Sequence, residues 1–182
     1  GEVFKEGTYE IESERRGYAL ELAVDFVRME YTRHRFWEKD DTPVVPLKSQ
    51  TLEDVIGTWP QGKINVRIGD YMFRPHQKWT ITAVPDGGGY LGGPYYKIVI
   101  EGTNRALAAT ADAEVVTVPE FTGAPEQLWR IDQLTDGTYR IIPKEVPGTD
   151  KELVLVSVGD STPSLGEFDM NSDNSKWNFR DH

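Results

Sequence analysis

Three tryptophans recur in related settings, and this repetition constrains the fold more than any other feature of the chain. Trp79, Trp129 and Trp177 are separated by 50 and 48 residues. Each follows a polar residue by two positions and precedes an apolar one by two, as in Gln77-Lys78-Trp79-Thr80-Ile81, Gln127-Leu128-Trp129-Arg130-Ile131 and Ser175-Lys176-Trp177-Asn178-Phe179. Residues two apart on a strand share a face. The pattern therefore predicts three short strands, each with tryptophan and Ile or Phe on the same side.

Two further landmarks accompany each tryptophan in the same order. The first is a Tyr two residues before an Ile, in Gly7-Thr8-Tyr9-Glu10-Ile11, Gly93-Pro94-Tyr95-Tyr96-Lys97-Ile98 and Gly137-Thr138-Tyr139-Arg140-Ile141. The second is a short apolar run around Leu20, Leu107 and Leu153, which follow their tyrosines by 11, 11 and 14 residues. The three extra residues are attributed to a longer turn at Pro147-Gly148-Thr149.

These landmarks predict an all-β chain of three repeats packed around a pseudo-three-fold axis. Strand-sized apolar runs alternate with Gly-, Pro- and Asp-rich connections. One repeat alone would expose an apolar face, whereas three repeats closed on one another bury it and leave no sheet edge. The 182 residues suit a single domain, with repeats at about 1–84, 85–134 and 135–182.

The first repeat carries an insertion. Tyr9 and Trp79 are 70 residues apart, against 33 and 38 for the corresponding pairs. About 30 extra residues are therefore expected within about 25–63, and long insertions in small β-domains often carry function. The segment 26–39 alternates aromatic and basic residues and includes Arg28, Arg33 and Arg35. It could form a strand pair or a protruding loop, and the arginines could instead pair with acids close by in sequence.

Composition excludes several kinds of function. There is no cysteine, which removes disulfides, thiolate catalysis and Cys-type zinc sites. The formal net charge of −10 opposes binding to nucleic acid and to anionic membrane surfaces. No apolar run has the length of a membrane helix. The missing cysteines, the lack of an Asn-x-Ser/Thr acceptor and the lack of a visible signal peptide favour the cytoplasm, although Gly1 could be a processed end, which leaves secretion open.

The sequence contains no pattern typical of a catalytic site, a metal site or a cofactor site. His34, His76 and His182 lie in unrelated settings and no nucleophile-elbow sequence is present. The segment 169–174 is rich in oxygen ligands but lacks the Gly and the final Glu of a calcium loop, which favours a solvated turn. We therefore expect a binding protein with no catalytic residues, no metal site and no cofactor.

One Gln-x-Trp element per repeat, with Gly-x-Tyr-x-Ile at the start of the repeats, resembles the β-trefoil superfamily, which includes ricin-B-type lectins and several protease inhibitor families. The galactose-binding form of the lectin pattern has an Asp directly after the leucine of the second strand. Glu21, Ala108 and Val154 follow the three leucines in this chain. The resemblance therefore implies the fold, but not that form of sugar site.

The middle of the chain is similar to the β-trefoil serine protease inhibitors of mushrooms. The similarity lies in Asn104-Arg105-Ala106-Leu107, in 114–119, in 124–131 and in Asp136-Gly137-Thr138-Tyr139. It implies inhibition of a serine protease by a rigid loop, but the inhibitory residues of that family lie in variable loops, so the resemblance assigns none here. Arg28, Arg33 and Arg35 are the candidate contacts because a loop of the insertion could present them to the acidic pocket of a trypsin-like protease. A second candidate is the glycine-rich segment 86–94 with Gly88, Gly89 and Gly92, by similarity to the clitocypin group of cysteine protease inhibitors. The alternative interpretation of these glycines is that they permit tight turns.

We expect a protease inhibitor that acts as a monomer, with a protease as its partner. The alternative is a carbohydrate-binding module with a glycan partner and a sugar site unlike that of ricin. A third interpretation is a subunit that contacts a partner protein through the insertion.

Overall fold

The computed structural model describes residues 4–15, 18–27, 44–46, 62–90, 93–158 and 162–181. Within them the regular elements are strands and short 3₁₀ turns, and no helix there is long and apolar enough to cross a membrane. In chain order they are β1 (Gly7–Ser13), β2 (Ala19–Leu22), β3 (Asp25–Val27), β4 (Val44–Pro46), β5 (Ile64–Gly69), η2 (Pro75–Gln77), β6 (Trp79–Tyr90), β7 (Gly93–Ile100), β8 (Ala106–Ala109), β9 (Val115–Val118), η3 (Pro125–Gln127), β10 (Trp129–Gln133), β11 (Tyr139–Pro143), β12 (Val154–Val158), β13 (Thr162–Gly166), η4 (Asp173–Ser175) and β14 (Trp177–Asp181).

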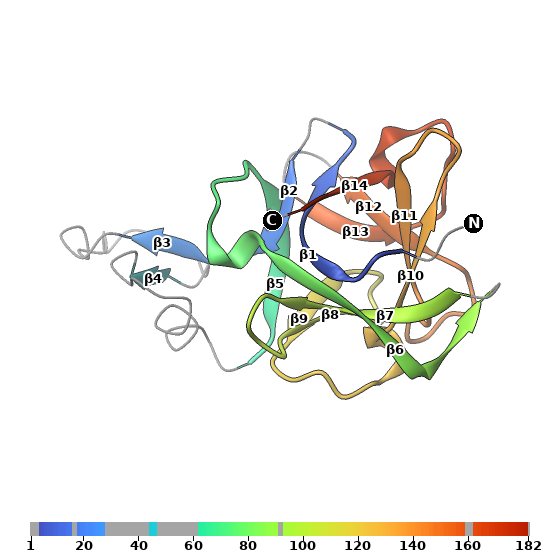
Figure 1. Ribbon diagram of the computed structural model, residues 1–182, viewed down its shortest axis with the longest axis horizontal. Helices are drawn as coiled ribbons and strands as arrows, with labels where there is room; N and C mark the ends of the chain where they lie inside the picture. The colour runs from blue at the N-terminus through green and yellow to red at the C-terminus, as the bar shows by residue number, and fades with distance from the viewer. Residues whose placement is uncertain are drawn as a thin grey trace.

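Strands β1, β6, β7, β10, β11 and β14 form a closed antiparallel barrel (Figure 1). Within each repeat the first strand pairs with the last, and the paired residues are equivalent: Tyr9 with Trp79, Tyr96 with Trp129, and Tyr139 with Trp177. Consecutive repeats are joined by the pairs β6–β7, β10–β11 and β14–β1. Closure of this ring leaves its strands without a free edge.

Apart from β3 and β4, the other strands form one antiparallel hairpin per repeat: β2–β5, β8–β9 and β12–β13. Six barrel strands and three such hairpins, repeated around one axis, are the architecture of a β-trefoil. The all-β, three-fold prediction is therefore confirmed.

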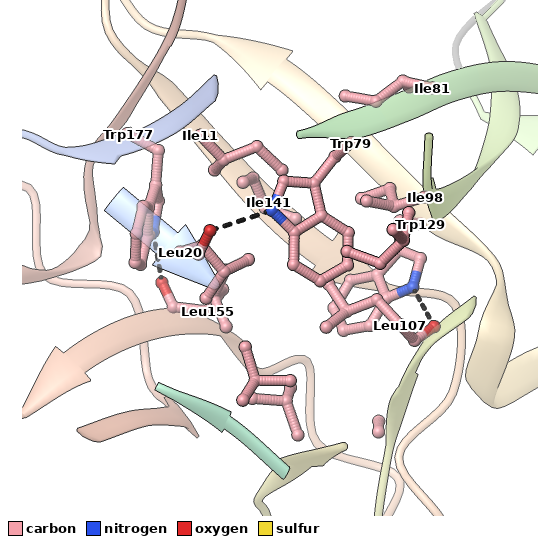
Figure 2. Close-up of a cluster of buried hydrophobic side chains, with 14 of the residues drawn as sticks. Ile11, Leu20, Trp79, Ile81, Ile98, Leu107, Trp129, Ile141, Leu155 and Trp177 are labelled. Carbon is pink, nitrogen blue, oxygen red and sulfur yellow. Dashed lines mark hydrogen bonds between the residues drawn. The ribbon is translucent and has the colours of Figure 1, made fainter. Parts of the chain in front are cut away.

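The three tryptophans are fully buried and are held in the same way (Figure 2). The indole Nε1 atoms of Trp79, Trp129 and Trp177 donate hydrogen bonds of 2.9 Å to the carbonyl oxygens of Leu20, Leu107 and Leu155. A buried indole N–H needs such an acceptor. The equivalent leucine of the third repeat is thus Leu155, and the alignment on Leu153 was wrong by two residues, because the loop before β12 is longer than the apolar pattern indicates.

Phe4 closes the barrel near its axis. Its ring lies 5.3, 5.7 and 5.7 Å, centroid to centroid, from the rings of Tyr9, Tyr96 and Tyr139, one from each repeat, and 4.7 Å from Phe179. The Tyr9 and Tyr96 hydroxyls donate to the backbone carbonyls of Lys5 and Phe4. A single residue that precedes β1 therefore contacts all three repeats.

The extra length of the first repeat lies between the two strands of its hairpin. Leu20 and Trp79 are 59 residues apart, whereas the equivalent pairs are each 22 apart, so the first repeat is 37 residues longer over this stretch. Of the insertion, the structure describes β3 and β4, a parallel pair beside the barrel (Figure 1).

The described part of the glycine-rich segment, 86–90 and 93–94, belongs to two paired strands. Strand β6 continues to Tyr90 and pairs with β7, with an irregularity between Val84 and Gly89. Gly88 has a φ of +89°, and a Cβ at Gly89 would stand 2.6 Å from the carbonyl oxygen of Gly93. The described part of 86–94 agrees with the interpretation that these glycines permit a tight turn, because they let two backbones approach closely in a bulged hairpin.

Candidate functional site

Each repeat forms the same surface feature beside its tryptophan. A 3₁₀ turn (η2, η3 or η4) precedes the tryptophan and packs on the second strand of the repeat (β2, β8 or β12). We call the surface between that strand, its hairpin partner and the 3₁₀ turn the lateral site. The three lateral sites are equivalent in backbone and differ in side chains.

The polar residue of each Gln-x-Trp element organises the loop before its 3₁₀ turn. In the first repeat, Gln77 Oε1 accepts from the backbone N–H of Met72 at 2.8 Å, while Nε2 donates to the carbonyl of Asp70. In the second, Gln127 Oε1 accepts from the backbone N–H of Thr122 at 2.8 Å. In the third, the Ser175 hydroxyl donates to the carbonyl of Asp169 at 3.2 Å. In the sequence these residues only mark the repeat, whereas in the structure they support the loops.

The lateral site of the first repeat is filled by a buried ion network. Glu21 accepts from Arg67 Nε at 2.7 Å and from Gln77 Nε2 at 2.8 Å, and its Oε2 lies 3.3 Å from His76 Nε2. Burial alone would raise the pKa of the Glu21 carboxyl, but hydrogen bonds from His76, Arg67 and Gln77 hold the pKa below its usual value. Arg67 also donates to the carbonyl of Val24, at the start of the insertion.

In each repeat, the residue after the leucine that accepts the tryptophan hydrogen bond pairs with a residue of the neighbouring strand of the hairpin. The pairs are Glu21 with Arg67, Ala108 with Val116, and Val156 with Ser164. The relevant residue of the third repeat is thus Val156 and not Val154, a correction that follows from the new alignment on Leu155. The second lateral site has an apolar pair at this position. No repeat has Asp there.

The lateral site of the third repeat is an open cleft of about 200 Å³ between β12, the end of β13 and η4. Its walls carry Val156 and Val158, and its rim carries Glu167, Asp169 and Asn174. The Glu167 side chain is 79% exposed. Asn174 makes no side-chain hydrogen bond in the part of the chain that the structure describes. This cleft therefore combines hydrogen-bonding groups facing solvent with an apolar wall.

A larger pocket of about 530 Å³ lies between the second and third repeats, lined by Tyr95, Arg130, Lys144 and the segment 145–152 among others. Several of its charged residues make contacts within the protein. Arg130 pairs with Asp132 and Glu152 at 2.9 Å each, and Lys144 donates to the carbonyl of Gly87 while its Nζ stands 5.1 Å from the Tyr95 ring centroid. Three of the charged residues that line this pocket, Arg130, Lys144 and Glu152, are thus already paired within the protein.

The residues singled out in the sequence are not gathered into one site. Arg28, Arg33, Arg35 and Gly92 lie outside the described residues, as do His34 and His182. Gly88 and Gly89 lie in β6, on the exposed side of a hairpin whose Gly87 packs on Leu128. Among the described residues no group of three or more His, Cys, Asp or Glu side chains could hold a metal. The 169–174 segment forms a turn in which Asp169 Oδ1 accepts from the backbone N–H of Asn171.

The closed barrel, its three hairpins and the repeated Trp–Leu bonds define the fold of this chain as a β-trefoil. Residues 75–164 match a family model described as ricin-type beta-trefoil lectin domain-like. No curated protein matches the sequence of the chain.

Solved structures agree with this fold at low sequence identity. The designed three-fold symmetric protein ThreeFoil superposes with a TM-score of 0.61 at 18% identity, covering 97% of this chain and 99% of its own. The Polyporus squamosus lectin bound to a human-type influenza-binding epitope gives 0.61 at 16% identity over 98% of this chain. A mosquitocidal holotoxin gives 0.64 at 14% over 99%. The chain spans 50% of that lectin chain and 18% of the holotoxin chain.

Proposed function

We propose that this protein binds carbohydrate without processing it, and that the lateral site of the third repeat holds the sugar. The observation that carries the proposal is the open cleft of about 200 Å³ there, with the carboxylates of Glu167 and Asp169 and the amide of Asn174 on its rim. The match of residues 75–164 to a lectin-like family model supports the same class of ligand.

The chemistry of the cleft suits a neutral sugar. Carboxylate oxygens accept from sugar hydroxyls, and the Asn174 amide can both donate and accept. The valine wall can take the C–H face of a sugar ring, as binding sites pair an apolar surface with a few placed polar groups. Two carboxylates on the rim of a chain with net charge −10 disfavour sialylated and sulfated glycans.

The two other lateral sites suit a sugar less well. In the first, Arg67, His76 and Gln77 already satisfy Glu21. In the second, Ala108 and Val116 offer no polar group at the paired position. We therefore expect one principal sugar site per chain.

A glycan array followed by calorimetry on the best neutral ligand tests this proposal. Asn174→Ala should weaken binding by roughly tenfold, since a hydrogen bond to a ligand is worth about 1–1.5 kcal/mol. Glu126 is the counterpart of Asn174 in the second repeat, since it directly precedes Gln127 as Asn174 precedes Ser175. Glu126→Ala should therefore leave the affinity unchanged. The proposal fails if no neutral glycan binds, or if Asn174→Ala binds as tightly as the wild type. The sugar should be recovered uncleaved.

The protease inhibitor interpretation remains a prediction from sequence resemblance. Its arginine candidates lie outside the described residues, and the fold matches add nothing in its favour. It predicts stoichiometric inhibition of a trypsin-like protease that is lost when the contact among Arg28, Arg33 and Arg35 is changed to Glu.

A further inference from the structure

The cleft of the third repeat is small in comparison with most ligand sites. Its volume is about 200 Å³, whereas pockets that enclose a drug-sized ligand have volumes of roughly 300–1,000 Å³. A cleft of this size suits a single sugar ring. The pocket between the second and third repeats, which we call the inter-repeat pocket, has a volume of about 530 Å³ and lies within that range.

The cleft and the inter-repeat pocket meet at one end of the β12–β13 hairpin. The segment 149–152 lines the pocket and leads into β12, where Val154 pairs with Gly166, a residue that lines the cleft. Lys151 belongs to the pocket and Glu167 to the rim of the cleft, and Lys151 Nζ stands 3.9 Å from Glu167 Oε1. The two sites therefore share a rim at this ion pair.

The ion pair on the shared rim is not a fixed barrier. The side chains of Lys151 and Glu167 are 73% and 79% exposed. An ion pair this exposed contributes little to stability, because water screens the charges and two long side chains must be ordered to form it. Both groups can therefore turn to a ligand, Lys151 as a donor and Glu167 as an acceptor.

The inter-repeat pocket also has carboxylates that are not used by the fold. Glu145 and Asp150 line it and are exposed, and neither side chain makes an ion pair or a hydrogen bond within the described part of the chain. The cations Arg130 and Lys144 are instead held by contacts within the protein. Two carboxylates are therefore left to accept hydrogen bonds from a ligand, as on the rim of the cleft.

Apolar groups complete the inter-repeat pocket. Ile142 and Val146 line it and are each only 3% exposed, so they form its floor, and Tyr95 adds an aromatic ring. Binding sites for small molecules pair such a surface with a few placed polar groups. The pocket therefore has the same combination of apolar surface and carboxylates as the cleft beside it.

We propose that the cleft and the inter-repeat pocket form one extended site for a neutral oligosaccharide. One sugar ring lies in the cleft, and the following rings cross the Lys151–Glu167 pair into the pocket. A sugar chain suits two neighbouring sites of like chemistry, because each ring offers hydroxyls around an apolar C–H face. This inference rests on the proposed sugar binding of the cleft and adds to it the length of the ligand.

Calorimetry with sugars of increasing length tests the extended site. The probes are N-acetylglucosamine, galactose, mannose and glucose, each as the monosaccharide and as linear oligomers up to the hexasaccharide. In the series that binds, the hexasaccharide should bind at least about tenfold more tightly than the monosaccharide, since the added rings form further hydrogen bonds. Equal affinities would overturn the extended site and leave a single sugar site in the cleft. No binding by any probe would also overturn it, and the glycan array alone would then decide whether the cleft binds another neutral sugar.

A double variant tests where the added rings lie. Glu145→Ala with Asp150→Ala should weaken hexasaccharide binding by at least about fivefold and leave the monosaccharide affinity unchanged, because the monosaccharide occupies only the cleft. Asn174→Ala should weaken the binding of both sugars by the same factor. Asp112→Ala with Glu114→Ala removes two exposed carboxylates between β8 and β9, outside both sites, and should change neither affinity. A hexasaccharide that binds the Glu145/Asp150 double variant as tightly as the wild type would overturn the proposal.

Discussion

At the scale of single residues, three equivalent positions on one scaffold have acquired different chemistry. The residue after the tryptophan-bonded leucine is Glu21, Ala108 or Val156, and its partner across the hairpin is Arg67, Val116 or Ser164. The first pair is charged and buried, the second is apolar, and the third borders an open cleft. Backbone equivalence therefore does not predict equivalent binding, because the side chains at these positions are independent of those that form the core.

Glu21 should link the stability of the protein to pH. Because its folded pKa is lowered, the carboxylate stabilises the fold above its unfolded pKa of about 4.3, and this contribution is lost as the pH falls through the folded value. Glu21→Gln should cost about 1–3 kcal/mol at pH 7, since it leaves buried donors without a charged acceptor. The difference from the wild type should shrink near pH 3.

Urea unfolding of both proteins at the two pH values measures this effect. Lys151 pairs with Glu167 at 3.9 Å and both side chains are exposed, so Glu167→Gln is a matched control that should cost far less. A Glu21→Gln penalty that does not change with pH would show that the loss is one of packing.

At the scale of elements, the first hairpin tolerates an insertion because its strands are positioned by other contacts. β2 and β5 keep four paired residues, from Ala19 with Gly69 to Leu22 with Val66. β5 also pairs with β9 of the second repeat, at Ile64 and Thr117. The register of the hairpin therefore does not depend on the connection between its strands.

Shortening this connection should leave the fold intact. In the second repeat the residues 110–114 join the equivalent strands β8 and β9. Replacing 25–62 with a connection of that length should preserve a cooperative unfolding transition, because loop-closure entropy changes only slowly with length. Thermal unfolding followed by circular dichroism measures this, with the tryptophan environment as a second probe. A broad, non-cooperative transition would show that the insertion contributes to the core.

At the scale of the whole molecule, the three repeats are held together at the axis as well as around the barrel. Phe4 touches a tyrosine of every repeat and also Phe179. The aromatic contacts are tilted or edge-on, which are the favoured geometries. The segment that precedes β1 therefore takes part in the closure of the barrel.

Phe4→Ala tests this role. It should destabilise the protein by about 2–3 kcal/mol, since a half-buried aromatic side chain and its ring contacts are lost. For a chain of this size the melting temperature should fall by about 4–10 °C. Phe121→Ala, which removes a half-buried ring away from the axis, is the comparison and should have a smaller effect. An unchanged melting temperature in Phe4→Ala would mean that the barrel closes without this residue.

Much of the fold could be predicted from the sequence, because its determinants are local. The alternation around Trp79, Trp129 and Trp177 marks strands, and its regular recurrence marks three repeats. The departure of Glu21, Ala108 and Val154 from the galactose pattern was also visible, although the third residue was misassigned. The location of the cleft was not predicted.

The sequence alone determined the all-β, three-fold architecture. The alternation of apolar and polar residues lies within each strand, and the pattern around the tryptophans recurs about every 50 residues. Only the tertiary structure decided which leucine accepts the third indole bond, since Leu153 and Leu155 both fit the apolar pattern. It also decided that Glu21 is neutralised by Arg67, 46 residues away, and that the third lateral site stays open. Contacts of this kind depend on the register between distant strands, and single-chain periodicity carries no information about that register.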